Sequence, residues 1–452
     1  MGDHSLHERP DGRQELVRLF DGEVTLGHVR MIEPAVSAGQ RVREPRLQRT
    51  PLRLHSSRGP VPDVFLWSRA AIWLAALFAF LAFDPYRNPL ARLYDDPGLT
   101  RDLGYVTDVW ARWDSVWFLR IAEHGYHGAS PSGAAWAFFP LYPALLWIAG
   151  HVFFGHYVLG GIAVSLAAAL GAFFLLHRLA ETRLGAGGAR RAVLYLAVFP
   201  MTFFLQAVYS ESVYLLLVLA AFVLAERGRW LPAWTVTGLA LLTRPSGIAL
   251  LPALALIAWR FPDRRRALGG SALSLGMLAA YPLTLWARGD DPWAFGHAQR
   301  LWHRHLSHEG PLGGIWNGMR AAWAGFEQLV TGSHTHHYWP AVHNMDPLRV
   351  AVINLQDFAF LLLFVALAVI AWRRFGAPYG LFAAVSLALP LSAPSSEWPL
   401  QSLPRFGLAI FPLFLALASL GGRPRVHTAI VAVSSLLLGV AVTEWALWQW
   451  VA

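Results

Sequence analysis

The stretch "VFLWSRAAIWLAALFAFLAF", residues 64–83, is apolar throughout except for one serine and one arginine. About twenty mainly apolar residues suffice for a helix to cross a bilayer, so this stretch predicts a transmembrane helix. Because further apolar runs follow it, the sequence predicts an all-α polytopic membrane protein with about 11–12 transmembrane or partial helices. The further runs lie near 157–180, 192–209, 211–226, 231–260, 267–286, 351–372, 377–393, 405–421 and 427–449.

The composition supports this class. Of the 452 residues, 55% are hydrophobic and only 14% are charged, whereas a soluble domain carries about 25% charged residues. There is no cysteine, which excludes disulfides and thiolate metal sites. All 37 basic residues are arginine and the net charge is +9. These arginines lie beside apolar segments, which favours topological anchoring over a nucleic-acid partner.

The N-terminal residues 1–62 differ from the rest of the chain. They mix charged residues with proline and glycine and lack a sustained apolar period, which predicts a disordered tail. The tail does not have the pattern of a signal peptide, because no apolar region follows a short basic start. Six arginines between 41 and 58 predict that this basic tail stays in the cytoplasm. Residues 63–452 then form one multi-pass membrane domain.

The arginine-rich connections predict the orientation of the spans. The arginine-rich connections are 183–191, 226–229, 260–266, 373–374 and 423–425. If all of them are cytoplasmic, the spans alternate consistently between the two sides of the membrane, on one condition. Residues 231–260 must make two short passes that turn at "TRPSG" (243–247). The outer side then receives 84–135 as the first extracytoplasmic loop, 287–350 as a large one, and the turns at 209–212, 243–247 and 395–405.

One apolar segment, "AWAFFPLYPALLWIAGHVFF" (135–154), breaks this alternation. If it were a full crossing, every later loop would lie on the opposite side of the membrane from the side that the arginines predict. Two prolines near its start favour a partial or re-entrant element on the outer side. An ordinary transmembrane helix is the alternative.

The stretch "RWDSVWFLRIAEHGY" (112–126) places Asp114 at the head of an amphipathic helical pattern in the first outer loop. One interpretation makes Asp114 a helix N-cap, with Gly125 ending the helix. The other interpretation makes it part of a site that handles a phosphate on a membrane-embedded molecule. In such a site an acid can accept a proton, and arginines at the membrane surface can bind the phosphate oxygens. Arg244 and Arg405 could instead be snorkelling anchors. The outer groups are Asp84, Asp95, Asp96, Asp102, Asp108, Asp114, Glu123, His124, His127, Tyr209, Glu211, Arg244 and Arg405.

Histidines gather in "HAQRLWHRHLSH" (297–308) and "HTHHYW" (334–339). His305 and His308 can share a helical face, and outer acids could complete a metal site. The spacing matches no specific zinc pattern, so we predict no metal centre.

Six motifs, in order along residues 64–420, resemble those of the PIG-V group and suggest a bacterial homologue. Eukaryotic members of that group add the second mannose to glycosylphosphatidylinositol. The group belongs to the GT-C glycosyltransferases, multi-pass enzymes that use a polyprenyl-phosphate sugar as donor. The motifs are "RWDSVWFLRIAEHGY" (112–126), "FFPLYP" (138–143), "YSES" (209–212), "TRPSG" (243–247), "GDDPWAFGHAQRLW" (289–302) and "LPRFGLAIFPLF" (403–414).

The resemblance implies a GT-C fold and an inverting transfer of mannose from polyprenyl-phosphate-mannose to a lipid or glycan acceptor at the extracytoplasmic face of the cell membrane. It implies that Asp114 is the catalytic base, with capping as a companion role. Arg244 and Arg405 would neutralise the departing phosphate. The resemblance requires no cofactor, and a role for a divalent cation is left as an open alternative. The substrate-binding candidates are Arg112, Trp113, Glu123, His124, Tyr209, Glu211, Arg244 and Arg405.

Two alternatives remain open at this point. The first is a GT-C transferase of another sugar, such as arabinose or glucose. The second is a lipid-linked-sugar transporter or a non-catalytic scaffold. A transporter should show repeated halves with interrupted helices at matching positions, and no clear internal repeat is evident in the sequence.

Overall fold

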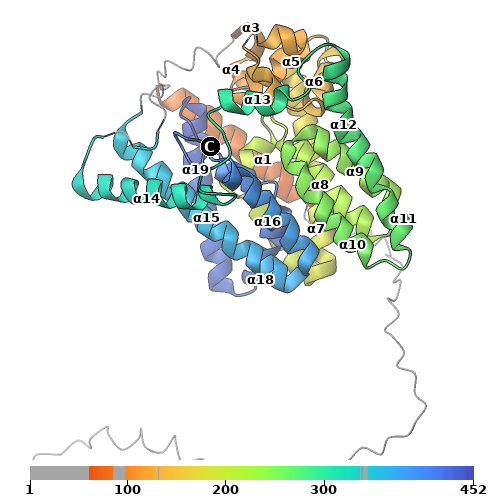
Figure 1. Ribbon diagram of the computed structural model, residues 1–452. Coiled ribbons are helices and arrows are strands. Elements are labelled where there is room, and N and C mark those ends of the chain that lie inside the picture. Colours follow the sequence, from red (N-terminus) through yellow and green to blue (C-terminus); the bar gives the residue numbers. More distant parts are fainter. Residues whose placement is uncertain (1–60, 85–96, 131, 336, 340–344, 452) are drawn as a thin grey trace, which may run out of the picture. The chain divides into compact units, whose positions relative to one another are not determined.

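The computed structural model of the chain describes residues 61–84, 97–130, 132–335, 337–339 and 345–451 (Figure 1). Residues 1–60, almost all of the predicted tail, lie outside this description, as do Asp95 and Asp96. Helix α1 (Val61–Ala82) contains nearly all of the stretch 64–83. At 1.5 Å per residue, its length of about 33 Å matches the roughly 30 Å hydrocarbon core of a bilayer.

The predicted all-α membrane class is confirmed. Apart from three residues in β1 (Asp102–Gly104), the regular elements of the described residues are helices. Five stretches within these residues are long and apolar enough to cross a membrane. They are α1, α7 (Tyr157–Ala197), the consecutive helices α11 (Arg264–Gly269) and α12 (Ser271–Ala287), α15 (Pro347–Phe375) and α19 (Pro424–Ala446).

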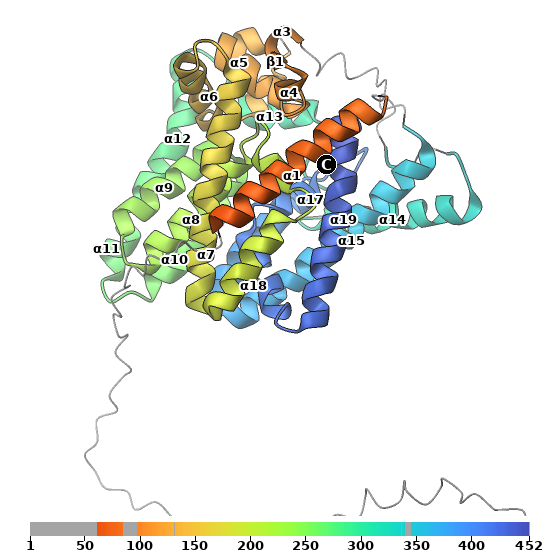
Figure 2. The same cartoon turned by 180° about the vertical axis from the view of Figure 1, so that it is seen from behind.

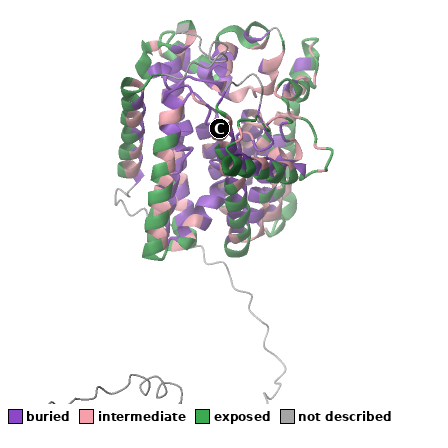
Figure 3. Cartoon of the chain, turned by 90° about the vertical axis from the view of Figure 1, so that its left-hand side faces the viewer, coloured by how far each residue is buried: buried purple, intermediate pink, exposed green. Residues whose placement is uncertain are grey.

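Apolar side chains cover the outer surface of these helices. Trp67 and Leu81 on α1 are 76% and 74% exposed, and Leu436 on α19 is 69% exposed. Figure 3 shows exposed residues along the outward faces of the helices and buried residues between them. Apolar surface this extensive is unusual on a soluble monomer, and we expect it to face lipid.

The segment 231–260 makes two separate helices, as predicted. Helix α9 (Trp230–Thr243) ends directly before Arg244, which has extended backbone. A single turn, η3 (Pro245–Ala249), then leads into α10 (Leu250–Trp259). The turn begins within the predicted "TRPSG" motif (243–247) and places Arg244 between the two helices.

Helix α7 contains the predicted span 157–180 and only the start of the predicted span 192–209, because it ends at Ala197 and the chain continues through turns and η2 (Thr202–Leu205). Its backbone leaves helical geometry at Gly185, whose φ of 69° lies in the left-handed region that favours glycine. This break falls inside the arginine-rich connection 183–191. A helical break at one glycine therefore takes the place of the loop that the sequence predicted.

The segment 135–154 forms a short helix. After η1 (Ala134–Ala137), helix α6 (Leu141–Val152) has 12 residues, which span about 18 Å. This is well below the roughly 30 Å needed to cross the hydrocarbon core, and α6 packs along α7. The length favours the partial-element interpretation over a full crossing.

Both predicted large outer segments contribute to one end of the helical body, at the top of Figure 1. The first loop supplies α3 (Pro97–Thr100), α4 (Tyr105–Asp108) and the predicted amphipathic helix α5 (Asp114–Ala129). Helix α5 buries Val116 and Leu119 and exposes Glu123, and its helical geometry breaks at Gly125. From the second segment, α13 (Ala294–Leu301) packs against η1.

The remaining helices complete the body around this end. Helix α1 packs against both α7 and α19 (Figure 2), so the first and last of the described helices are neighbours. The other elements are η2 (Thr202–Leu205), α8 (Glu211–Glu226), α14 (Gly313–Thr331), α16 (Ala377–Ser392), α17 (Leu403–Gly407) and α18 (Phe411–Leu420).

Candidate active site

A cavity of about 500 Å³ lies where α5, α13, α16, α17, the start of α8 and the turn between α9 and η3 meet. Residues 137–139 and Trp450 also line it, so eight parts of the sequence converge on one space. Of the predicted site residues, those that line the cavity are Asp114, Tyr209, Glu211, Arg244 and Arg405.

Asp114 is the first residue of α5 and faces the cavity with 16% of its side chain exposed. Its Oδ2 accepts a hydrogen bond from Arg405 Nη1 at 2.8 Å. Trp113, and not Asp114, is the N-cap residue, and no side chain caps this helix. The predicted capping role is therefore wrong, because the carboxylate points to Arg405 and not to the helix N–H groups.

Glu211, the first residue of α8, is almost fully buried, with 2% of its side chain exposed. Its Oε1 lies 3.4 Å from Arg405 Nε and 2.5 Å from Arg244 Nη1. Arg244 also donates a hydrogen bond to Ser210 Oγ at 3.3 Å. The four charged groups thus form a continuous chain in the order Asp114, Arg405, Glu211, Arg244.

A third arginine of the cavity, Arg304, was not among the predicted site residues. It donates a hydrogen bond to the Gln401 carbonyl at 2.9 Å and lies over the Phe406 ring. Among the described residues it forms no ion pair. Burial, followed by repulsion from Arg405, lowers the pKa of Arg304 to about 10, so it is still charged at neutral pH. The only sequence signal was its position in the histidine-rich stretch 297–308.

The other predicted site residues do not line the cavity. Glu123 and His124 lie on α5 with 39% and 54% of their side chains exposed, 3.8 Å from each other. Trp113 is 2% exposed and packs against the rings of Trp448 and Trp450.

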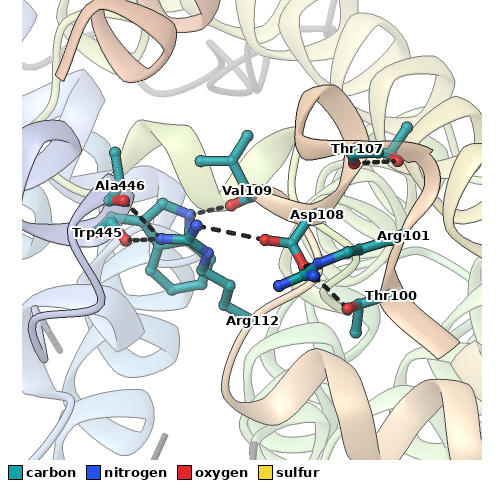
Figure 4. A network of polar contacts seen from close by, with 9 residues as sticks. Thr100, Arg101, Thr107, Asp108, Val109, Arg112, Trp445 and Ala446 are labelled. Atoms are coloured by element: carbon teal, nitrogen blue, oxygen red, sulfur yellow. Dashed lines mark hydrogen bonds and ion pairs between the residues drawn. The ribbon is translucent and has the colours of Figure 1, made fainter. Parts of the chain in front are cut away.

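Arg112 is buried and joins the first outer loop to the end of α19 (Figure 4). Its Nη1 donates hydrogen bonds to the carbonyls of Trp445 at 2.8 Å and Ala446 at 2.7 Å. Its Nη2 lies 3.4 Å from Asp108 Oδ2, and the other oxygen of Asp108 accepts a hydrogen bond from Thr100. A cation is favourable at a helix C-terminus, so Arg112 stabilises α19 as well as the loop.

Where the structure describes them, the histidine-rich stretches do not converge on a metal-binding group. His305 and His308 are solvent-facing, with ring centroids 6.1 Å apart. Within the described residues, no cluster of three or more His, Cys, Asp or Glu side chains could hold a metal ion.

Residues 102–256 match the family model for mannosyltransferases of the PIG-V type. This range covers less than half of the chain but contains Asp114, Tyr209, Glu211 and Arg244. The resemblance inferred from the motifs is confirmed over this range. No curated protein matches the chain.

Two solved structures resemble the chain at low sequence identity. The oligosaccharyltransferase of Archaeoglobus fulgidus, tethered with an acceptor peptide, aligns with a TM-score of 0.39 and 14% identity over 85% of this chain and 55% of that one. ArnT from Cupriavidus metallidurans, bound to undecaprenyl phosphate, aligns with a TM-score of 0.37 and 14% identity over 85% of this chain and 77% of that one. The chain therefore spans about half the length of the archaeal protein.

Proposed function

We propose that this chain is a membrane glycosyltransferase that moves mannose, with inversion, from a polyprenyl-phosphate-mannose donor to a hydroxyl of a lipid or glycan acceptor. The observation that carries the proposal is the cavity in which Asp114 shares space with three arginines. The family match over 102–256 supports the transferase class. The predicted outward orientation of the first loop favours an extracytoplasmic site.

The charges of the cavity suit a phosphate-bearing substrate. Three arginines face two carboxylates, which leaves one positive charge unbalanced among these side chains. Arg244 and Arg405 already contact Glu211 and Asp114. Arg304 forms no such ion pair among the described residues; Arg405 and Arg244 repel it, and the attraction from Asp114 is weaker than the repulsion from Arg405. An anion beside Arg304 would relieve that repulsion, so we assign the first contact with the donor phosphate to Arg304.

Arg244 and Arg405 then have a second role beside the one expected from the sequence. Arg405 bridges the two carboxylates, and Arg244 holds Glu211 from the other side. Fixed charges of this kind stabilise a departing phosphate without reorganising during the reaction. They also hold Asp114 in place until the substrates arrive.

The reaction needs one proton acceptor. The acceptor hydroxyl oxygen bonds to the anomeric carbon of the sugar while the bond from that carbon to the phosphate oxygen breaks. The electron pair leaves with the phosphate, and the hydroxyl proton passes to Asp114. Because the phosphate is a stable leaving group, no general acid is required. Attack from the face opposite the leaving group inverts the anomer, as in single-displacement glycosidases.

The test uses purified protein in nanodiscs with polyprenyl-phosphate-mannose, the glucose and arabinose analogues, and a panel of lipid and glycan acceptors. We expect transfer from the mannose donor, with inversion detected by NMR of the product. Faster transfer of glucose or arabinose would identify that sugar, and not mannose, as the substrate, while the assignment as a transferase would stand. Movement of the intact donor across vesicles without product formation would overturn the proposal in favour of a transporter.

We expect this transfer to proceed without a divalent cation. Both carboxylates that face the cavity are already in contact with arginines, so a metal ion would have to displace a fixed positive charge. Activity measured before and after EDTA treatment checks this. Loss of activity that manganese or magnesium restores would show that a cation is part of the site.

A further inference from the structure

The segment that follows α19 returns to the candidate active site. Trp450 lines the same cavity as Asp114. This segment lies beyond the family match at 102–256 and beyond residues 64–420, which carry the motif resemblance. Its contribution to the site is therefore visible only in the fold.

The residue before Asp114 has a backbone conformation that needs support. Trp113 has a φ of 56°, in the left-handed region. Such a conformation costs a non-glycine residue roughly 1–3 kcal/mol and persists only where the surrounding structure fixes it. Trp448 has the same property, with a φ of 61°. The two strained tryptophans pack against each other, with ring centroids 5.8 Å apart.

Two contacts fix Trp113. Its ring, 2% exposed, lies edge-on to Trp450, with centroids 4.9 Å apart and an interplanar angle of 74°, as well as against Trp448. On the backbone side, the Tyr209 hydroxyl donates to the carbonyl of Arg112 and accepts from the N–H of Asp114, both at 3.1 Å. Residue 113 is thus held from its side chain and from both neighbouring peptide groups.

The C-terminal segment is itself anchored to the loop that carries Asp114. The Arg112 guanidinium lies 4.5 Å from the centroid of Trp448 and donates to two carbonyls at the end of α19. Trp445 returns a hydrogen bond through its indole N–H to the carbonyl of Val109 (Figure 4). Aromatic pairs and cation–π contacts each contribute on the order of 1 kcal/mol, which together can offset the strain.

We propose that Trp448 and Trp450 are positioning residues for Asp114. They hold Trp113 in the left-handed conformation from which α5 starts, and so keep Asp114 Oδ2 at 2.8 Å from Arg405. The proposal rests on the proposed role of Asp114 as the base. Relaxation of Trp113 to an ordinary φ would rotate the first turn of α5 and move the carboxylate away from the acceptor.

The test compares Trp448→Ala and Trp450→Ala in purified, active protein. Trp450 lines the cavity, whereas Trp448 does not, so only a positioning role predicts that both changes act alike. We expect kcat to fall about a hundredfold in each, the size expected for a misplacement of about 1 Å, with the donor KM nearly unchanged. Trp286→Ala is the control, because Trp286 on α12 is 69% exposed and far from these contacts in sequence.

Normal kcat in folded Trp448→Ala would overturn the proposal, and so would a change confined to KM in Trp450→Ala, which would make Trp450 only a wall of the cavity. If the alanine variants do not fold, Trp448→Phe and Trp450→Phe decide, because phenylalanine keeps part of the ring packing. Folded phenylalanine variants should then show a reduced kcat, and wild-type kcat in both would overturn the proposal. Absence of transfer by the wild type would instead count against the proposed function.

Discussion

Asp114 and Glu211 face the same cavity but differ in access. Asp114 keeps 16% of its side chain exposed, whereas Glu211 keeps 2% and contacts two guanidinium groups. A general base must come within hydrogen-bond distance of the hydroxyl it deprotonates. Because Asp114 is the more accessible carboxylate, we propose it as the base, with Glu211 holding Arg244 and Arg405.

Replacing Asp114 by asparagine should therefore stop transfer without unfolding the protein. The amide is nearly the same size and its oxygen can still accept from Arg405, but it cannot take a proton. Loss of a general base costs about a hundred- to ten-thousandfold in rate. The rate of product formation with saturating donor and acceptor measures the loss.

The control for this change is Asp291→Asn. Asp108, a nearby acid, is unsuitable because it is buried and contacts Arg112 and Thr100. Asp291 is half-exposed and does not line the cavity. Near-normal transfer by folded Asp114→Asn would remove Asp114 from the chemistry.

The two arginines Arg304 and Arg405 should respond differently to alanine. Arg304→Ala leaves no carboxylate unpaired, so the fold should survive while the donor KM rises roughly ten- to a hundredfold, the value of a hydrogen bond to a charged group. Arg304→Lys should restore binding only in part, because lysine lacks the planar guanidinium group that can donate two parallel hydrogen bonds.

Arg405→Ala leaves two carboxylates without their shared cation, so it should also lower thermal stability. An unchanged donor KM in Arg304→Ala would contradict the phosphate assignment.

The sequence predicted some of these residues and missed others for a physical reason. Asp114, Tyr209, Glu211, Arg244 and Arg405 all lie in short motifs between or beside apolar runs, and the structure brings them together at one cavity. Arg304 and Trp450 carry no such local signal. Their positions depend on how α13 and the segment after α19 fold back onto the cavity, which periodicity along the chain does not encode.

At the scale of elements, Arg112 joins the first outer loop to the end of α19 through two hydrogen bonds and forms a buried ion pair with Asp108 inside the loop. Arg112→Ala should leave the buried Asp108 with Arg101, 3.5 Å away, as its remaining cation and remove the hydrogen bonds to the end of α19. Removing one partner of a buried pair costs up to about 3–5 kcal/mol in the free energy of unfolding, and the contact with Arg101 should offset part of that loss. Reversible unfolding in mixed micelles measures the change.

Arg425→Ala is the matched control for that experiment, because Arg425 is exposed in the first turn of α19. Equal stability of the two variants would mean that the Arg112 network contributes little. Loss of stability only in Arg112→Ala would show that Arg112 acts through the fold and not through the cavity, which it does not line.

The helices themselves follow the sequence more closely than the site does. The two separate helices within 231–260 and the amphipathic helix in the first outer loop were predicted, because each depends on local apolar spacing and turn residues. The connection at Gly185 was predicted as a loop, since glycines and arginines there interrupt the apolar pattern. One glycine with positive φ is enough to make the break, so the helical hydrogen bonds resume directly after it.

At the scale of the whole molecule, the arginine distribution predicts which end faces the cytoplasm. The first half of α7, from Tyr157 to Gly185, is long enough to cross the hydrocarbon core. It separates the end that holds α5 and α6 from the arginine-rich connection 183–191. The end with the cavity should therefore be extracytoplasmic.

Single cysteines test this orientation without background, because the chain contains none. Ser132 and Ala186 are exposed and lie on the two predicted sides, whereas Ser130 is buried and unsuitable. An impermeant maleimide should label Ser132→Cys in intact cells, since charge bias places the first loop outside, and should label Ala186→Cys only after lysis. The cysteine-free parent is the control. The reverse pattern would put the cavity on the cytoplasmic side, where the donor sugar would have to be presented from the inner leaflet.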